Sequence, residues 1–188
     1  ICKNGGINFM ENIIEANPKL YKFGDLRQNI WIPKFKWVSS ISVAADIINS
    51  WHEDYPKYVK NTEIAINRIS IINLFYDPLN TGTISNNYLN YIHSIIFEDK
   101  DFAGHFRESN VIVGNHLPPR YENVPRLMEN FGKAWQGNIK DIDSLIVWGT
   151  DGLTVHPYVD GNGRVFNSFI AAISHILFPE LGYLTALQ

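Results

Sequence analysis

The sequence predicts a mostly α-helical fold, a helical bundle around a central buried helix, with one small β-hairpin. Apolar residues recur at helical spacing in several segments from Ser40 onward. The stretch after Gly163 is apolar on more than one face, which is typical of a helix enclosed by others. The β-branched run Val111–Val113 precedes Gly114 and Asn115, and this combination predicts a short strand and a turn.

Residues 1–58 are expected to form an N-terminal extension that is partly helical. Glycine, proline and aromatic residues interrupt residues 1–38, apart from a short helical piece at Met10–Ala16. Ser40 or Ser42 can cap a helix that ends before Pro56. The residues predicted to share the apolar side of this helix are Val43, Ile47, Ile48 and Trp51.

Residues 59–188 are expected to form the main domain. Its first predicted elements are a helix from Thr62 that Asp77–Pro78 stops, a turn at Asn80–Gly82 and a helix capped by Ser85. The later elements are a hairpin within residues 104–119, helices at Val124–Trp135 and Ile142–Trp148, a turn at Thr150–Gly152, and the central helix, which Pro179 ends.

The composition excludes several classes of protein. At 188 residues, with 45% hydrophobic and 19% charged residues, the chain is one folded domain with an extension rather than a disordered tail. The formal charge is -3, and Lys34–Trp37 is too short a basic patch to indicate a nucleic-acid partner. The longest apolar run, Phe169–Phe178, is interrupted by Ser174 and His175 and is far shorter than the ~20 residues of a membrane-spanning helix, so no membrane partner is expected. Because the chain begins at Ile1 rather than Met, we expect a processed or truncated product.

No structural metal or disulfide framework is expected. The single Cys2 excludes an internal disulfide and a cysteine-based zinc site. The run His52–Asp54 is expected to be a solvated helix end, and His105 and His116 to be surface turn residues beside the hairpin. Five histidines show no zinc-ligand spacing such as His-Glu-x-x-His: His52, His93, His105, His116 and His175.

The segment that carries chemistry runs from His156 to Arg164. Gly161–Gly163 allows a tight turn directly before a helix, so backbone N–H groups and the helix dipole can bind an anion such as phosphate. Arg164 adds a forked cation for phosphate oxygens, and Asp160 is a hard oxygen ligand suited to magnesium. His156 titrates near neutrality and can accept a proton from a hydroxyl. This combination predicts a phosphoryl- or nucleotidyl-transfer site.

The same segment resembles the signature of the Fic (Fic/Doc) family, whose pattern reads His-Pro-Phe-x-Asp-Gly-Asn-Gly-Arg-x-x-Arg. Upstream, Gly104–Arg107, Val111–Gly114 and Pro118–Pro119 resemble the flap hairpin of the family. Val124–Met128 resembles the start of its next helix, and the predicted helices within residues 61–97 fit its opening helices. The resemblance implies the Fic fold, with the flap at about 104–119 and the active-site loop at 156–164.

The resemblance further implies a protein adenylyltransferase, which moves AMP from ATP onto a Ser, Thr or Tyr hydroxyl of a target protein with the help of Mg2+. His156 would be the base that deprotonates the hydroxyl, and Asp160 would hold Mg2+ between the α- and β-phosphates. Tyr158 stands where the family has Phe, so its ring would anchor the loop while its hydroxyl needs a partner. The predicted nucleotide-binding residues are Gly161, Asn162, Gly163, Arg164 and Asn167.

The flap would hold the target segment by strand addition. The residues expected to do so are Arg107, Val111, Ile112, Val113 and Gly114. Such a protein is expected to act in the cytoplasm of its own cell or, as a secreted effector, in the cytosol of a host.

Two departures from the family pattern leave alternatives open. Asn167 replaces the final Arg, which in the family meets the γ-phosphate. This change could weaken binding of the ATP tail, permit another donor such as UTP, GTP or a CDP-linked alcohol, or leave an impaired nucleotide-binding member. The inhibitory helix of the family has no good match, since Ser94–Glu98 comes nearest but is followed by Asp99. We therefore expect a member that no inhibitory helix within this chain restrains.

Overall fold

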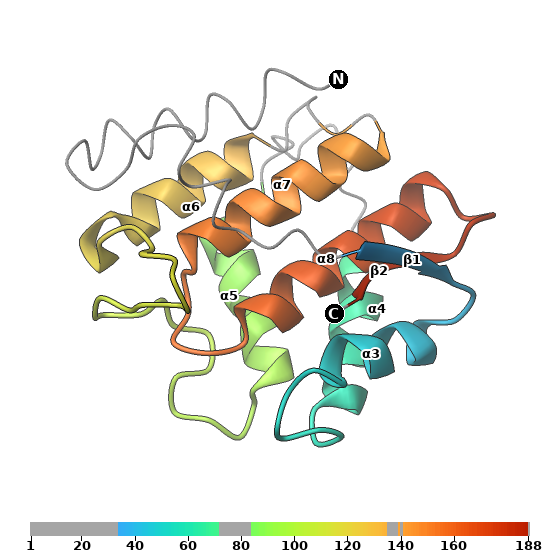
Figure 1. The fold of residues 1–188 in the computed structure, drawn as a ribbon, viewed down its shortest axis with the longest axis horizontal. Helices are drawn as coiled ribbons and strands as arrows, with labels where there is room; N and C mark the ends of the chain where they lie inside the picture. The colour runs from blue at the N-terminus through green and yellow to red at the C-terminus, as the bar shows by residue number, and fades with distance from the viewer. Residues whose placement is uncertain (1–33, 72–83, 135–138, 140, 188) are drawn as a thin grey trace.

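The computed structural model describes residues 34–71, 84–134, 139 and 141–187 (Figure 1). The elements in chain order are β1 (Lys34–Val38), α3 (Ile41–Asn49), α4 (Val59–Ile71), α5 (Asn86–Ile96), a short 3-10 helix (Tyr121–Asn123), α6 (Val124–Lys133), α7 (Ile142–Val155), α8 (Asn162–Leu177) and β2 (Tyr183–Leu187). The prediction of a mostly helical fold is confirmed.

Helix α8 is the centre of the bundle, as predicted from its apolar faces. It contacts α3, α4, α5, α7 and β2, and it crosses the middle of the view between α7 and the α3–α4 pair (Figure 1). Every residue from Arg164 to Ser174 is buried. A helix apolar on all sides can be stable only where neighbours cover all of them, and these neighbours supply the cover.

The predicted helix caps at Ser40 and Ser85 are confirmed. The Ser40 hydroxyl accepts a hydrogen bond from the Val43 N–H at 3.3 Å, and Ser85 accepts one from Tyr88 at 3.1 Å. The predicted apolar side of α3 is partly wrong, because Val43 is 47% exposed. The residues of α3 that face the core are Ala44, Ala45, Ile48 and Asn49, and α3 packs against α4.

Two predicted boundaries are corrected. Helix α4 begins at Val59 rather than Thr62, and the Thr62 hydroxyl lies buried inside it, where it accepts a hydrogen bond from Asn49 at 2.8 Å. Helix α7 runs to Val155, so the turn predicted at Thr150–Gly152 is wrong. A Cβ at Gly152 would overlap the ring of Phe166, so this glycine serves the close packing of α7 on α8 rather than a turn.

The sequence predictions missed the two-stranded antiparallel sheet. Strand β1 pairs with β2, with Lys34 opposite Leu187 and Val38 opposite Tyr183. Together β1 and α3 bring residues 34–49 against β2, α4 and α8. The domain boundary near residue 58 stays a prediction.

The segment predicted as a hairpin flap forms a tight turn. Val113 and His116 exchange two backbone hydrogen bonds of 3.0 and 2.9 Å around Gly114, whose φ is 57°. Val111 and Ile112 lie outside this single bridge, so the strand predicted at Val111–Val113 is wrong, and one isolated bridge closes the turn. The predicted helix at Met10–Ala16 and the signals at Asp77–Pro78 and Asn80–Gly82 lie outside the described residues.

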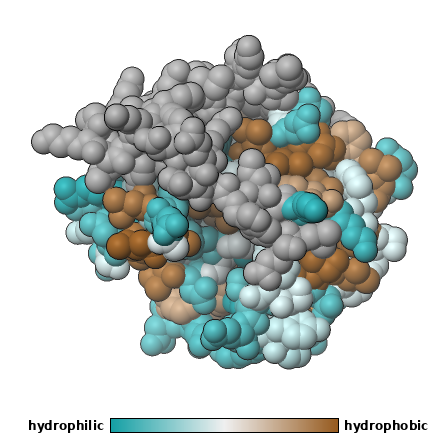
Figure 2. All heavy atoms as spheres, in the orientation of Figure 1, coloured by the Kyte–Doolittle hydropathy of each residue, from teal (hydrophilic) through white to brown (hydrophobic). Residues whose placement is uncertain are grey.

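The described surface mixes residue types. On the face shown in Figure 2, hydrophobic residues form separate groups between hydrophilic ones. Within the described ranges, no helix combines the length and the apolar character needed to cross a bilayer.

Candidate functional site

The predicted active-site loop joins the end of α7 to the start of α8, the central helix. His156 ends α7 with a left-handed backbone (φ 50°), and Gly161 precedes α8 with φ 80°. Between them the Asn162 side chain accepts a hydrogen bond from the Tyr158 N–H and donates one to the Tyr158 carbonyl, both at 2.9 Å. This reciprocal pair gives the loop one defined shape.

The Tyr158 ring anchors the loop in the core, as predicted. It is fully buried and stacks on the His93 ring, with centroids 3.9 Å apart. Its hydroxyl finds the partner it needs in the Asn90 side-chain oxygen, at 3.2 Å. Burial raises the pKa of the Tyr158 phenol, so this hydroxyl stays protonated and can donate that bond.

The two glycines of the loop have different environments. A Cβ at Gly161 would collide with the Phe97 ring. At Gly163, apart from its chain neighbours and the backbone of its own helix, no atom of the described residues lies within 4 Å of the position that a Cβ would take. The backbone of Gly163, in the first turn of α8, therefore borders open space. Free helical N–H groups beside open space are a favourable place for an anion.

His156 is held as a neutral imidazole. Burial, followed by the charge of Arg107 and the proximity of His116, lowers the pKa of His156 to about 4. Its backbone oxygen accepts a hydrogen bond from the Arg107 Nε at 2.8 Å. At neutral pH the ring is a proton acceptor, which is the state that a general base requires.

Asp160 is the exposed carboxylate of the loop. One of its oxygens accepts a hydrogen bond from the Gly161 N–H at 2.6 Å. Among the described residues no group of three His, Cys, Asp or Glu side chains could hold a metal without other ligands. A single carboxylate is the donor set expected for Mg2+ that takes its other ligands from phosphates and water.

The Arg164 side chain lies inside the protein, with 1% exposed. One of its terminal nitrogens forms an ion pair with Asp54, from the segment between α3 and α4, and its guanidinium lies over the rings of Tyr58 and Phe97. Among the described residues no acceptor forms a hydrogen bond with its Nε or Nη1. A buried cation with two donors lacking a partner is a strong candidate to bind an anion.

Asn167 is buried one turn further along α8. Its side chain donates a hydrogen bond of 2.8 Å to the Gly163 carbonyl. This amide carries no charge, so it supplies no cation at the position where the family pattern has its second Arg.

Arg107 ties the flap segment to the loop. Its side chain is 2% exposed and donates to the backbone oxygens of His156, Ser109 and Pro119, while its N–H donates to the Pro157 oxygen at 2.8 Å. The surface of the segment is instead formed by its other predicted residues, Val111, Ile112, Val113 and Gly114, of which Ile112 is 75% exposed.

Three residues near the loop have roles that the sequence predictions did not include. Asp54, expected in a solvated helix end, pairs with Arg164. His52 lies close enough to Arg164 and Asp160 for their charges to act on its pKa, which burial lowers most. His93 contacts the loop directly, and its place among Leu89, Ile92 and Ile96 in the helical period was the signal that could have revealed its burial. Neither Asp54 nor His52 carried such a local signal.

The helix that came nearest to the inhibitory pattern has other partners. Ser94 donates a hydrogen bond to the Tyr91 carbonyl within α5, and Glu98 accepts one from Asn61 at 3.3 Å.

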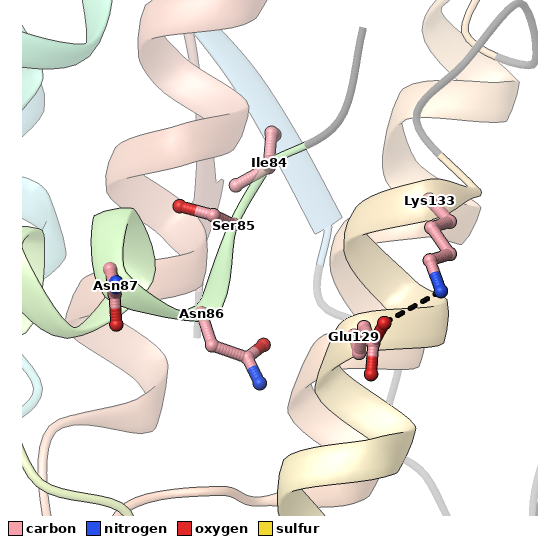
Figure 3. A pocket seen from close by; sticks show the side chains of 6 residues that line it. All are labelled: Ile84, Ser85, Asn86, Asn87, Glu129 and Lys133. Atoms are coloured by element: carbon pink, nitrogen blue, oxygen red, sulfur yellow. Dashed lines mark hydrogen bonds and ion pairs between the residues drawn. The ribbon is translucent and has the colours of Figure 1, made fainter. Parts of the chain in front are cut away.

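A pocket lies apart from the loop, between the start of α5 and the end of α6 (Figure 3). Glu129 and Lys133 on its rim form an ion pair at 2.6 Å. Its lining contains none of the predicted site residues: Ile84, Ser85, Asn86, Asn87, Glu129 and Lys133.

Residues 83–173 match the sequence model described as the Fic/DOC family. The fold is similar to that of a Fic family protein from Desulfovibrio desulfuricans, with a TM-score of 0.56, 15% identity, and coverage of 96% of this chain and 60% of that one. It is also similar to that of a variant of IbpAFic2 in complex with adenylylated Cdc42, with a TM-score of 0.55, 11% identity, and coverage of 97% of this chain and 57% of that one. A third similar structure is that of a Fic domain containing signalling protein from Bacteroides thetaiotaomicron, with a TM-score of 0.52, 12% identity, and coverage of 90% of this chain and 62% of that one. The chain therefore spans less than two thirds of each of these proteins, and the likeness concerns the fold.

Proposed function

Because residues 83–173 form a Fic/DOC family domain, as the motif predicted, we propose that this protein transfers AMP from ATP to a Ser, Thr or Tyr hydroxyl of a target protein. The observation that carries the proposal is the buried Arg164, whose Nε and Nη1 lack partners among the described residues. Arg164 follows Gly163 in the first turn of α8, and the backbone of Gly163 borders open space. A phosphate tail is an anion that fits both features.

The loop residues have the chemistry that the reaction requires. His156, neutral at physiological pH, accepts the proton of the target hydroxyl. The hydroxyl oxygen then bonds to the α-phosphorus of ATP, the bond from that phosphorus to the bridging oxygen breaks, and pyrophosphate leaves with its electron pair. Arg164 and the first N–H groups of α8 bind the phosphate oxygens.

Asp160 is the residue that would hold Mg2+. When bound, this ion neutralises charge on the phosphates and helps to orient them. The chain itself contributes an exposed carboxylate, one oxygen of which accepts a hydrogen bond from the Gly161 N–H.

The acceptor is proposed to be a protein. One fold neighbour was solved in complex with adenylylated Cdc42, which supports both the transferred group and the class of acceptor. The exposed flap segment at Ile112 is proposed to dock the target segment by backbone pairing, since the N–H and the carbonyl of Val113 already pair with His116. A cytosolic setting, where ATP and Mg2+ are abundant, stays a prediction.

A second candidate uses a different donor. Asn167 supplies no cation where the family pattern has Arg. A triphosphate tail should therefore bind less tightly here than in relatives that have the Arg. Of the alternative donors, a CDP-linked alcohol has no γ-phosphate and loses nothing by this change, whereas UTP and GTP carry the same tail as ATP and would have to be selected through the nucleobase. Nucleotide binding without turnover is the limiting case.

The test is transfer of a labelled nucleotide in the presence of Mg2+, with the protein alone and with cell lysate, followed by mass spectrometry of the labelled bands. We expect label from ATP with the wild type and none with His156→Ala, while His175→Ala at the far end of α8 keeps its activity. A panel of ATP, GTP, UTP, CTP and CDP-choline identifies the donor. Modification by His156→Ala at the wild-type rate would remove the base assignment, and preference for a non-adenine donor would replace the first proposal by the second.

A further inference from the structure

His93 is a polar side chain in the hydrophobic core with no part in the chemistry proposed above. It lies on α5, one of the helices that pack against α8, and it is fully buried. A buried imidazole costs free energy unless both ring nitrogens have partners. Both do, and the partners come from two different segments.

The hydrogen bonds of His93 define its tautomer. The backbone N–H of Gly104 donates to Nδ1 at 2.9 Å. A backbone N–H is only a donor, so Nδ1 must be the unprotonated nitrogen. The proton is therefore on Nε2, which donates to the backbone carbonyl of Asp160 at 3.1 Å.

One ring thus connects three parts of the site. Gly104, with a φ of 74°, forms the turn that leads into the flap segment, and Asp160 is the candidate metal ligand of the loop. The face of the same ring stacks on Tyr158 at 3.9 Å, with an angle of 15° between the planes. His93 thus contacts the loop at Tyr158 and at Asp160, which are two residues apart, so its contacts fix this short stretch.

We propose that His93 is a positioning residue, which sets the direction of the Asp160 carboxylate through the hydrogen bond from its Nε2 to the Asp160 carbonyl. Holding the peptide oxygen on the core side leaves the carboxylate on the exposed side, where Asp160 lies. The inference rests on the proposed function for what Asp160 binds. The placement of the loop by His93 does not depend on it.

Two substitutions separate the two hydrogen bonds. In His93→Asn the amide oxygen stands at the place of Nδ1, so it can accept from Gly104 but cannot reach Asp160. In His93→Gln the amide nitrogen stands at the place of Nε2, so it can donate to Asp160. Both variants lose the aromatic stack on Tyr158, which makes each the matched control of the other.

The first readout needs no activity. Hydrogen exchange of the amides in residues 158–164 should be faster in His93→Asn than in His93→Gln, at the same pH and temperature. Equal exchange in the two variants, or the reverse order, would overturn the inference. If either variant fails to fold, the long-range proton–nitrogen NMR spectrum of the wild-type imidazole decides, because the opposite tautomer would refute the bond to Asp160.

The second readout is the Mg2+ concentration that gives half-maximal AMP transfer. Loss of a residue that orients a metal ligand typically weakens metal binding by about 10–100-fold. We therefore expect the half-maximal Mg2+ concentration to rise by about 10–100-fold in His93→Asn and to change by less than about threefold in His93→Gln. Equal loss in both would mean that His93 only stabilises the fold. If the wild type transfers no AMP, the proposed function fails, and the exchange readout still tests the position of the loop.

Discussion

Replacing the two glycines of the loop by alanine separates folding from nucleotide binding. A Cβ at Gly161 would lie 2.0 Å from the Phe97 Cε2, and Gly161 has a φ of 80°. Phe97 cannot move aside easily, because it is fully buried against Tyr58 and His93, with ring centroids 5.0 Å away in both cases. Overpacking costs about 1–3 kcal/mol and a left-handed alanine about 1–2 kcal/mol. Gly161→Ala should therefore lose roughly 2–5 kcal/mol of unfolding free energy.

For a chain of this size that loss corresponds to a fall in Tm of roughly 4–20 °C. Gly163→Ala is the matched control, since its backbone is helical and, beyond its own helix turn, its Cβ meets no atom of the described residues within 4 Å. Alanine in a helix is favoured over glycine by up to about 1 kcal/mol, so this variant should be as stable as the wild type or more so. Its methyl group nevertheless fills the space proposed for phosphate, so we expect binding of Mg2+-ATP about tenfold weaker, or about 1.4 kcal/mol.

Thermal melts, denaturant titrations and calorimetry with a non-hydrolysable ATP analogue measure these effects. A wild-type melting temperature for Gly161→Ala would refute the reasoning about Phe97. Unchanged nucleotide affinity in Gly163→Ala would show that phosphate does not bind at the first turn of α8.

Three further predictions concern charge and hydrogen bonding around the loop. Burial is the main cause that lowers the pKa of His93 and of His156 to about 4, whereas in the unfolded chain both titrate near 6.5. Between pH 6.5 and pH 4 the unfolded chain therefore binds more protons than the folded one. The free energy of unfolding should have its full value above pH 6.5 and fall as the pH is lowered to 4, by about 3 kcal/mol for His93. Denaturant titrations between pH 7 and pH 4 measure this, and a constant unfolding free energy would contradict it. Asp54→Asn removes the ion-pair partner of Arg164, so it should lower the free energy of unfolding by roughly 1–3 kcal/mol. It should also tighten Mg2+-ATP binding up to about fivefold, because phosphate no longer competes with a carboxylate for Arg164. Calorimetry that finds weaker binding would refute that competition. Asn162→Ala removes two hydrogen bonds to the loop backbone and should cost about 2–4 kcal/mol, with faster hydrogen exchange in the loop; wild-type exchange would show that other contacts give the loop its shape.

The features that the sequence predicted correctly depend on local chemistry. Ser40 and Ser85 cap helices because their hydroxyls accept from the third residue on, a signal contained within four residues. The central position of α8 followed from its apolar faces. The loop could be proposed because its residues are contiguous.

The features that were missed depend on contacts between distant segments. Strand β1 pairs with β2 at the opposite end of the described chain, so neither has its partner nearby in sequence. Asp54 and Arg164 are 110 residues apart. Gly152 was interpreted as part of a turn, since the sequence does not show that a ring of α8 packs against it.

A crystal structure of the protein with Mg2+ and a non-hydrolysable ATP analogue tests the central claim most directly. We expect the phosphate tail against the Gly163 N–H and the Arg164 Nε and Nη1, the metal on the Asp160 carboxylate, and the α-phosphate facing the His156 ring. Nucleotide bound elsewhere, with the Arg164 Nε and Nη1 still without an anion, would contradict the account.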